Sequence, residues 1–190
     1  MTDPDLQLVR ALQAGDDSAF DELMLRHKAA IFAFICRYLR NEADAADLTQ
    51  ETFVRAYFRI CSFKPRARFA TWLFTIATNL CRDRVRSRAY RDSHRTLPLS
   101  TGAANDLPEP RSGDLEPDQA VERDERLRIL EAAIDRLPHD LKTALILTAM
   151  EGLSHAEAAE RLGVTAKTIE TRVYRARHRL EAMLRNVQLR

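Results

Sequence analysis

The stretch Ser154-His-Ala-Glu-Ala-Ala-Glu-Arg-Leu-Gly-Val-Thr-Ala-Lys-Thr-Ile-Glu-Thr-Arg-Val-Tyr-Arg175 predicts two helices joined by a tight turn. Ser154 and Glu157 have the spacing of a capping box, in which each side chain binds the backbone amide of the other residue. Gly163 can adopt the left-handed conformation that ends a helix sharply, and Thr165 can cap the next helix. This stretch therefore predicts a helical hairpin with a fixed crossing angle.

The hairpin has the spacing of a helix-turn-helix. A small residue precedes the glycine by four positions and apolar residues surround it, namely Ala159, Leu162, Val164 and Ile169. The second helix buries a stripe through Ile169, Val173, Ala176, Leu180 and Leu184, so Lys167, Glu170, Thr171, Tyr174 and Arg175 face outward. Further cations follow at Arg172, Arg177, Arg179 and Arg185. This concentration of cations favours binding to duplex DNA. The alternative is a helical hairpin whose basic face is only solvated.

The chain before the hairpin contains two helical parts that are separated by a stretch of different composition. Helical periodicity over 6–12, 20–38, 48–60 and 69–80 predicts a bundle, and 127–137 and 141–149 predict two more helices. Between Tyr90 and Val121 the chain carries four prolines and almost no large apolar side chains, and its middle is acidic, with Asp106, Glu109, Asp114, Glu116 and Asp118. Such a segment favours an extended linker. We therefore predict an all-α fold with two small helical domains, 1–90 and 124–190, joined by a flexible linker over 91–123.

Composition excludes several classes of protein. The 190 residues are 45% hydrophobic and 31% charged, with a formal net charge of +2. Cys36, Cys61 and Cys81 have no spacing typical of a zinc site or a disulfide framework. The N-terminus lacks a signal-peptide pattern, and no apolar run approaches the roughly 20 residues that span a bilayer. We expect a cytoplasmic protein without membrane insertion, metal or cofactor.

A second surface suited to nucleic acid follows the third predicted helix. Opposite the apolar stripe of the helix over 69–80 and its continuation lie Thr71, Thr75, Asn79, Arg82 and Arg86. The preceding loop adds Lys64, Arg66 and Arg68 beside Phe63, Phe69 and Trp72. Cations can follow the phosphates of a single strand while aromatic rings stack on its bases. The alternative is that the aromatic residues are core and the arginines form a solvated helix end.

The start of the third predicted helix is acidic. Asp47, Gln50 and Glu51 fall on one helical face. Paired carboxylates can serve acid–base catalysis or metal binding, but no histidine or further carboxylate has the spacing to complete such a site. No glycine-rich phosphate loop is present either. The face is then a solvated first turn or a docking surface for a basic partner, and we expect no catalytic residues.

Together these segments resemble the extracytoplasmic-function group of the sigma-70 superfamily. The resemblance rests on Asp47-Leu-Thr-Gln-Glu-Thr-Phe53, on Phe69-Ala-Thr-Trp-Leu-Phe-Thr-Ile-Ala-Thr-Asn-Leu-Cys-Arg-Asp83, and on Leu137-Pro138, Glu151–Ala159 and Thr168–Arg177. It covers nearly the whole chain outside the linker. It implies a factor that binds core RNA polymerase, recognises the −35 and −10 promoter elements and promotes DNA melting.

The resemblance also implies residue roles and partners. Asp47, Gln50, Glu51 and Arg55 would contact the β′ clamp helices of the polymerase, and the C-terminal domain would approach the β flap. Asn79, with the loop from Phe63 through Lys64 and Arg66 to Arg68, would hold a flipped −10 base near Trp72, while Arg82 and Arg86 would contact the backbone. Lys167, Thr171, Arg172, Tyr174 and Arg175 would engage the −35 major groove. Glu170 departs from the basic residue frequent in relatives and can tune base preference. An anti-sigma factor, which can itself be membrane-bound, would mask the polymerase-binding surfaces.

The alternative function is an effector-sensing regulator with a C-terminal helix-turn-helix. It explains the C-terminal half of the chain equally well. It does not explain the basic and aromatic residues between Phe63 and Arg86, or the segment Asp47–Phe53. The scattered histidines form no constellation typical of an enzyme. The sequence therefore favours the sigma factor.

Overall fold

The computed structural model describes residues 3–65, 68–94 and 117–188, and these residues form helices and turns with no strand among them. The expected all-α fold is confirmed. The N-terminal half contains α1 (Leu6–Gln13), α2 (Ser18–Leu39), α3 (Glu42–Arg59), the 3₁₀ turn η1 (Ile60–Ser62) and α4 (Phe69–His94). The C-terminal half contains α5 (Pro117–Asp135), α6 (His139–Leu145), the π-helical turn η2 (Ile146–Met150), α7 (His155–Leu162) and α8 (Ala166–Gln188).

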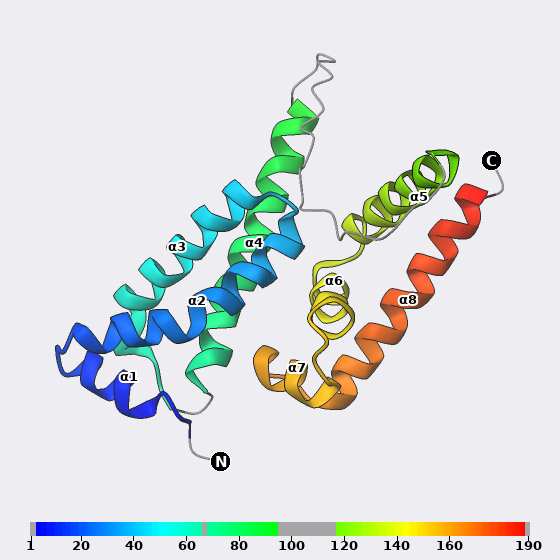
Figure 1. The fold of residues 1–190 in the computed structure, drawn as a ribbon. Coiled ribbons are helices and arrows are strands. Elements are labelled where there is room, and N and C mark those ends of the chain that lie inside the picture. Colours follow the sequence, from blue (N-terminus) through cyan, green and yellow to red (C-terminus); the bar gives the residue numbers. More distant parts are fainter. Residues whose placement is uncertain (1–2, 66–67, 95–116, 189–190) are drawn as a thin grey trace.

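The N-terminal bundle packs α2, α3 and α4 against each other, with α1 on α2 (Figure 1). Its interior is apolar and aromatic, and Phe34 and Phe74 contact ring to ring at 5.6 Å between centroids. Arg40 ends α2 in a left-handed conformation, and the Asn41 side chain then accepts a hydrogen bond from the Asp44 amide at 2.8 Å. An amide oxygen at this position satisfies a free backbone donor of the first turn. The chain therefore reverses between α2 and α3 within a few residues.

The helix-turn-helix forms as its sequence predicts. Ser154 and Glu157 make both bonds of the capping box, at 3.3 Å from the Glu157 amide to Ser154 Oγ and 2.9 Å from the Ser154 amide to Glu157 Oε2. Gly163 ends α7 with a φ of 64°, and the Thr165 hydroxyl accepts from the Thr168 amide. These local bonds fix where α7 ends and α8 begins.

The helices that flank the expected linker are longer than predicted. Helix α4 continues to His94, and α5 already begins at Pro117. Proline is well accepted at the first helical position because its missing amide would have no partner there. Residues 95–116 lie outside the described residues, so a flexible linker there, and the domain boundaries drawn from it, stay predictions.

The two halves pack against each other and share one hydrophobic core. Helix α4 contacts α7, and α2 contacts η2. Ile146, Leu147 and Ala158 of the C-terminal half belong to the same buried cluster as Phe34 and Phe74. A smaller cluster joins α5, α6 and α8. The sequence predicted two helical units but not this packing between them, which determines the surroundings of the predicted DNA-binding residues.

Candidate functional site

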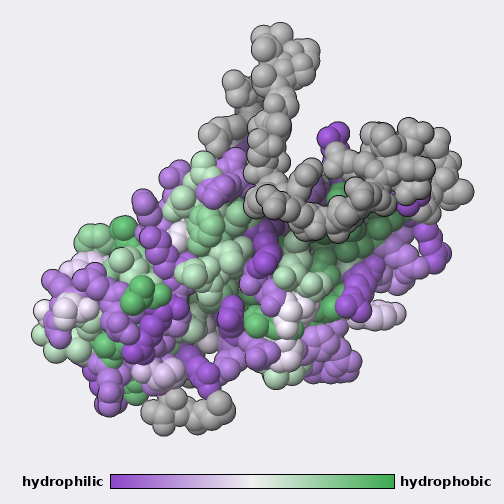
Figure 2. Space-filling model, viewed as in Figure 1, coloured by the Kyte–Doolittle hydropathy of each residue, from purple (hydrophilic) through white to green (hydrophobic). Residues whose placement is uncertain are grey.

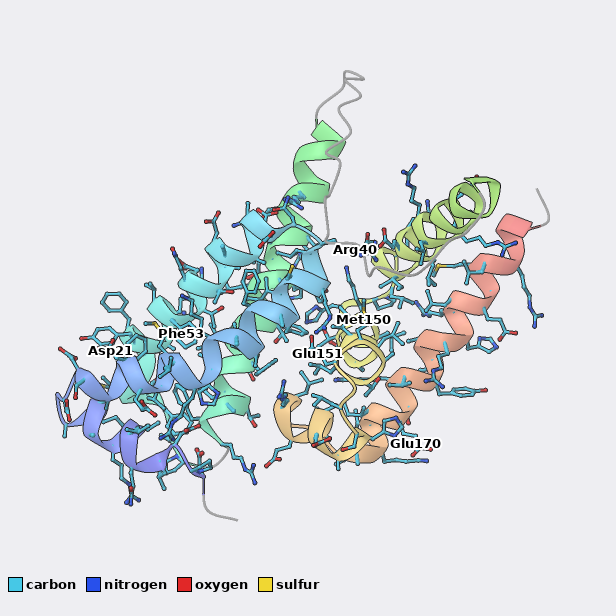
Figure 3. The ribbon with its side chains drawn as sticks, viewed as in Figure 1. Asp21, Arg40, Phe53, Met150, Glu151 and Glu170 are labelled. Carbon is cyan, nitrogen blue, oxygen red and sulfur yellow. The ribbon has the colours of Figure 1, made fainter. Side chains whose placement is uncertain are left out.

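The outward face of α8 is open to solvent. Tyr174 has 69% of its surface exposed, and Lys167 and Arg175 are exposed as well. The Thr171 hydroxyl donates to the Lys167 carbonyl at 2.9 Å, and Lys167 Nζ lies 3.0 Å from both carboxylate oxygens of Glu170. Figure 3 shows Glu170 on the side of α8 away from the N-terminal half. The structure therefore brings Lys167, Thr171, Tyr174 and Arg175 onto one accessible surface, with Glu170 beside it.

Arg172 does not join this surface. Its side chain is 25% exposed and pairs with Asp140 of α6 at 3.2 Å. It also lines a cavity between the two halves of the molecule. The sequence alone did not separate Arg172 from its neighbours, because the cue lies in α6, which is distant along the chain.

The polar face of α4 is partly covered by the C-terminal half, although Thr75 and Arg82 remain exposed. Thr71 is buried, and its hydroxyl donates to the Glu160 carbonyl of α7. A Cβ atom at Gly163 would lie 3.4 Å from Thr71 Cγ2, and the positive φ there is rarely adopted by L side chains. Gly163 thus serves both the turn of the helix-turn-helix and the close approach of α7 to α4.

A cavity of about 180 Å³ separates the rest of this face from α6 and α8. Thr75, Asn79 and Arg82 line it from α4, and His139, Asp140 and Arg172 line it from the other side. Asn79 is half-buried. The predicted base-binding residue therefore faces the C-terminal half in this arrangement.

Charged pairs connect the two halves around the shared core. Arg37 of α2 donates to Glu151, which lies where the halves meet (Figure 3). Arg40 binds the Glu131 carboxylate at 3.2 Å and its carbonyl at 2.9 Å. In addition, Arg68 Nε lies 2.5 Å from Glu160 Oε1. Partly exposed pairs contribute little individually, so the shared apolar core supplies most of the attraction and the pairs define its register.

One polar cluster at this junction is titratable. Tyr38 Oη and His139 Nδ1 are 2.8 Å apart, and Lys142 Nζ lies 4.4 Å from the centre of the Tyr38 ring. Burial raises the pKa of Tyr38 and lowers the pKa of His139. Both shifts favour the neutral forms, so the Tyr38–His139 contact is between uncharged groups near neutral pH.

The aromatic residues predicted near the −10 strand form a cluster of edge-to-face and tilted rings. Phe63, Phe69 and Trp72 contact one another with ring centroids 5.4 to 6.1 Å apart. Phe63 and Phe69 are buried, whereas Trp72 is half-buried and Lys64 is exposed. Only Trp72 and Lys64 of this group have surface available to DNA here. Arg66 lies outside the described residues.

The arginines beyond Asn79 divide between two environments. Arg84 and Arg88 pair with Asp44 at the start of α3. Arg82 and Arg86 are exposed on another side of α4. The structure thus separates two structural arginines from the two predicted to contact the DNA backbone.

The predicted polymerase-binding face lies on α3. Asp47 and Gln50 are exposed, and Glu51 accepts from Arg55 Nε at 2.6 Å. Two exposed apolar residues, Val54 and Phe58, lie beside this face and were not predicted to belong to it; 48% of Val54 and 79% of Phe58 is accessible.

Val54 and Phe58 border an apolar groove between α2 and α3 that is also lined by Phe20, Met24 and Tyr57. Figure 2 shows apolar surface at this end of the molecule. Gln50, Val54 and Phe58 are spaced four residues apart, so the sequence could have indicated that the two apolar residues share a helix face with Gln50.

The described part of the chain shows neither a candidate metal site nor a membrane-spanning helix. Its His, Cys, Asp and Glu residues form no group of three or more that could hold a metal ion. None of its helices is both long enough and apolar enough to cross a membrane.

The two halves match two parts of one family. Residues 23–91 match Sigma-70 region 2, and residues 127–180 match Sigma-70, region 4. Neither is a family of enzymes.

Curated relatives align with almost the whole chain. The RNA polymerase sigma-H factor of Pseudomonas aeruginosa is 34% identical, over 95% of this chain and 93% of the relative. The ECF RNA polymerase sigma factor SigW of Bacillus subtilis is 31% identical, over 94% and 96%.

Solved structures of similar fold also align with most of the chain. CnrH in complex with the cytosolic domain of CnrY matches with a TM-score of 0.60 and 30% identity, over 97% of this chain and 99% of CnrH. The sigma factor RpoE of Bartonella quintana, in complex with the anti-sigma factor NepR, matches with a TM-score of 0.58 and 28% identity, over 87% and 96%. The chain belongs to the extracytoplasmic-function group of RNA polymerase sigma factors, with α1–α4 containing region 2 and α5–α8 containing region 4.

Proposed function

We propose that this sigma factor docks on core RNA polymerase through the exposed face of α3, reads −35 duplex DNA with α8, and binds the −10 strand with α4. The β′ clamp helices would meet Asp47, Gln50 and Glu51, and the β flap would meet region 4. The observation that carries the proposal is a contrast in exposure. The α3 and α8 faces are open to solvent, whereas the α4 face lies against α6 and α7.

Promoter binding by α4 then requires region 4 to move away. Thr71 and Arg68 cannot contact Glu160 and DNA with the same polar atoms. The −35 face needs no such movement. The arrangement described here is therefore a closed state, and the complex with polymerase and promoter is an open one.

An anti-sigma factor is the partner that would favour the closed state. Two structural neighbours, CnrH and RpoE, were solved in complex with the cytosolic domain of CnrY and with the anti-sigma factor NepR. A protein that binds both halves of this chain at once would oppose their separation, since binding to one state shifts the equilibrium toward it.

Reconstituted transcription tests the polymerase-docking part. Charge reversal in Asp47→Lys/Glu51→Lys should abolish binding to core polymerase and promoter-specific initiation, because the face would become basic and would repel the basic partner that the acidic face attracts. A matched control, Asp21→Lys/Glu42→Lys, makes the same change of net charge at other exposed positions of α2 and α3. A folded Asp47→Lys/Glu51→Lys protein that binds polymerase like the wild type would contradict the assignment.

A further inference from the structure

Helix α1 and the residues just before it bind backbone groups at the end of η1 and at the start of α4, although they lie outside the part of the chain that matches Sigma-70 region 2. That match begins at residue 23, whereas α1 covers Leu6–Gln13. Val9 and Leu12 are buried in the core and fix α1 to the bundle. The polar residues of α1 and of the residues before it are therefore held at defined positions, and two of them bind backbone groups of the −10 region.

Gln13 binds the backbone before the segment. Its Nε2 donates to the Ile60 carbonyl at 2.8 Å and to the Phe63 carbonyl at 3.2 Å. The Ile60 carbonyl also accepts from the Phe63 amide at 3.0 Å, so Gln13 binds its second lone pair, and the Phe63 carbonyl lies directly after η1. Gln13 thus satisfies them from a distant part of the sequence and fixes the backbone at Phe63.

Asp3 binds the backbone after the segment. Its Oδ2 accepts from the Phe69 amide at 2.8 Å, while Oδ1 accepts from the Asp5 amide at 3.1 Å. Phe69 is the first residue of α4, so this carboxylate satisfies a free donor and complements the positive end of the helix. Asp3 thereby fixes the start of the helix that carries Asn79.

A buried acidic contact supports this attachment. Asp5 is 3% exposed and pairs with His27 of α2 at 2.7 Å and with Arg26 at 3.2 Å. The His27 ring also lies 5.6 Å from the Phe69 ring, measured between centroids. The N-terminal residues are therefore connected to α2 and to the Phe63–Phe69–Trp72 group at the same place.

We propose that Gln13 and Asp3 are positioning residues for recognition of the −10 strand. They hold Phe63 and Phe69 at fixed positions, so that Lys64, Trp72 and Asn79 are presented to a base in one geometry. A preorganised site loses less conformational entropy when it binds a base. Because its geometry is fixed, it can also distinguish bases that differ only slightly in shape. This inference rests on the proposed −10 role of α4 and deepens it.

The test uses the complex of the protein with core polymerase and a single-stranded DNA pool with a randomised central stretch. Sequencing before and after capture gives the base preference. Gln13→Glu keeps the shape but places carboxylate oxygens against two carbonyls, so the preference for the best base should fall about fivefold. Gln13→Lys retains a donor for both carbonyls and should retain the preference. Gln7→Glu, at an exposed site of the same helix, is the matched control.

Asp3→Ala provides a second variant, with the same expected loss of preference. Unchanged base preference in both Gln13→Glu and Asp3→Ala, with preference lost in Asn79→Ala, would overturn the positioning role and leave the −10 role of α4 intact. Unchanged preference in Asn79→Ala as well would refute the proposed −10 role itself. A uniform loss of capture for all sequences, together with a lower melting temperature, would mean that the two residues only stabilise the fold.

Discussion

The two predicted DNA-binding faces differ in what covers them. On α8, Tyr174 and Lys167 point into solvent, and their nearest polar partners belong to the same helix. On α4, Thr71 is bound to α7 and Asn79 faces a cavity bordered by α6 and α8. The predicted surface for duplex DNA is accessible in the closed state, whereas the predicted surface for a single strand is partly covered.

This difference implies an order of events at a promoter. A closed molecule can contact −35 duplex DNA, but exposure of Asn79 requires separation of α4 from α7. Since the two halves share a core with Phe74 and Ile146 in one cluster, separation exposes apolar surface and costs free energy. Polymerase, which binds both halves of the protein in the proposed function, would offset that cost.

The largest expected effect concerns the covered face. Asn79→Ala should prevent open-complex formation on duplex promoters and weaken binding to single-stranded −10 DNA, because an unstacked base loses its hydrogen-bonding partner. Binding of −35 duplex DNA should remain unchanged. Permanganate footprinting of the melted region measures the effect. Melting at the wild-type level by Asn79→Ala would mean that Asn79 is only a polar residue of the interface between the halves.

The next effect concerns the solvent-exposed face of α8. Arg175→Ala should weaken −35 duplex binding by about 1 to 3 kcal/mol if Arg175 reads a base edge, with relaxed preference at one position. If Arg175 contacts only phosphate, the loss of affinity should be similar on all sequences. The slope of the logarithm of the binding constant against the logarithm of the salt concentration should then fall in magnitude by about one. Titrations at several salt concentrations separate the two cases. Full affinity with full preference would contradict any role for Arg175.

A smaller effect is expected from the interface pairs. Arg37→Glu places two carboxylates together at Glu151, so it should favour the open state and strengthen −10 strand binding by the free protein several-fold. The exchanged pair Arg37→Glu/Glu151→Arg should return binding toward the wild-type value. Fluorescence anisotropy with a labelled strand measures both. Equal binding by all three proteins would mean that this pair does not control closure.

The smallest expected effect is a dependence on pH. Burial in the closed state lowers the pKa of His139 from an ordinary value of 6.5, so its stabilising contribution is present above that value and is lost as the pH falls through the lowered pKa. The charged groups around it are Asp140, which raises the pKa, and Arg82, Arg172 and Lys142, which lower it; Tyr38 is its hydrogen-bonding partner.

Strand binding by the free protein should therefore increase as the pH falls from about 6.5 to about 5.5, because protonation of His139 favours the open state. His139→Gln should remove most of this increase. An equal increase in the variant would assign the pH effect to other groups.

Local signals predicted much of this molecule. The capping box at Ser154, the glycine turn at Gly163 and the apolar stripe of α8 all depend on neighbours in sequence, and all are confirmed. The packing of α4 on α7 and the pair between Arg172 and Asp140 depend on residues far apart in the chain. Helical periodicity identifies a buried face but not the element that buries it, so the covered −10 face could not be predicted from the sequence.

In the proposed function, binding of the −10 strand requires the two halves to separate. Spin labels at Ala46→Cys on α3 and Ala156→Cys on α7, both exposed positions, report this directly in a chain whose native cysteines are replaced by alanine. Double electron–electron resonance should give the same short distance between the two spin labels in the free protein and in its complex with −35 duplex DNA. Longer distances should appear when core polymerase and the −10 strand are bound. The same short distance with the strand bound would contradict the account.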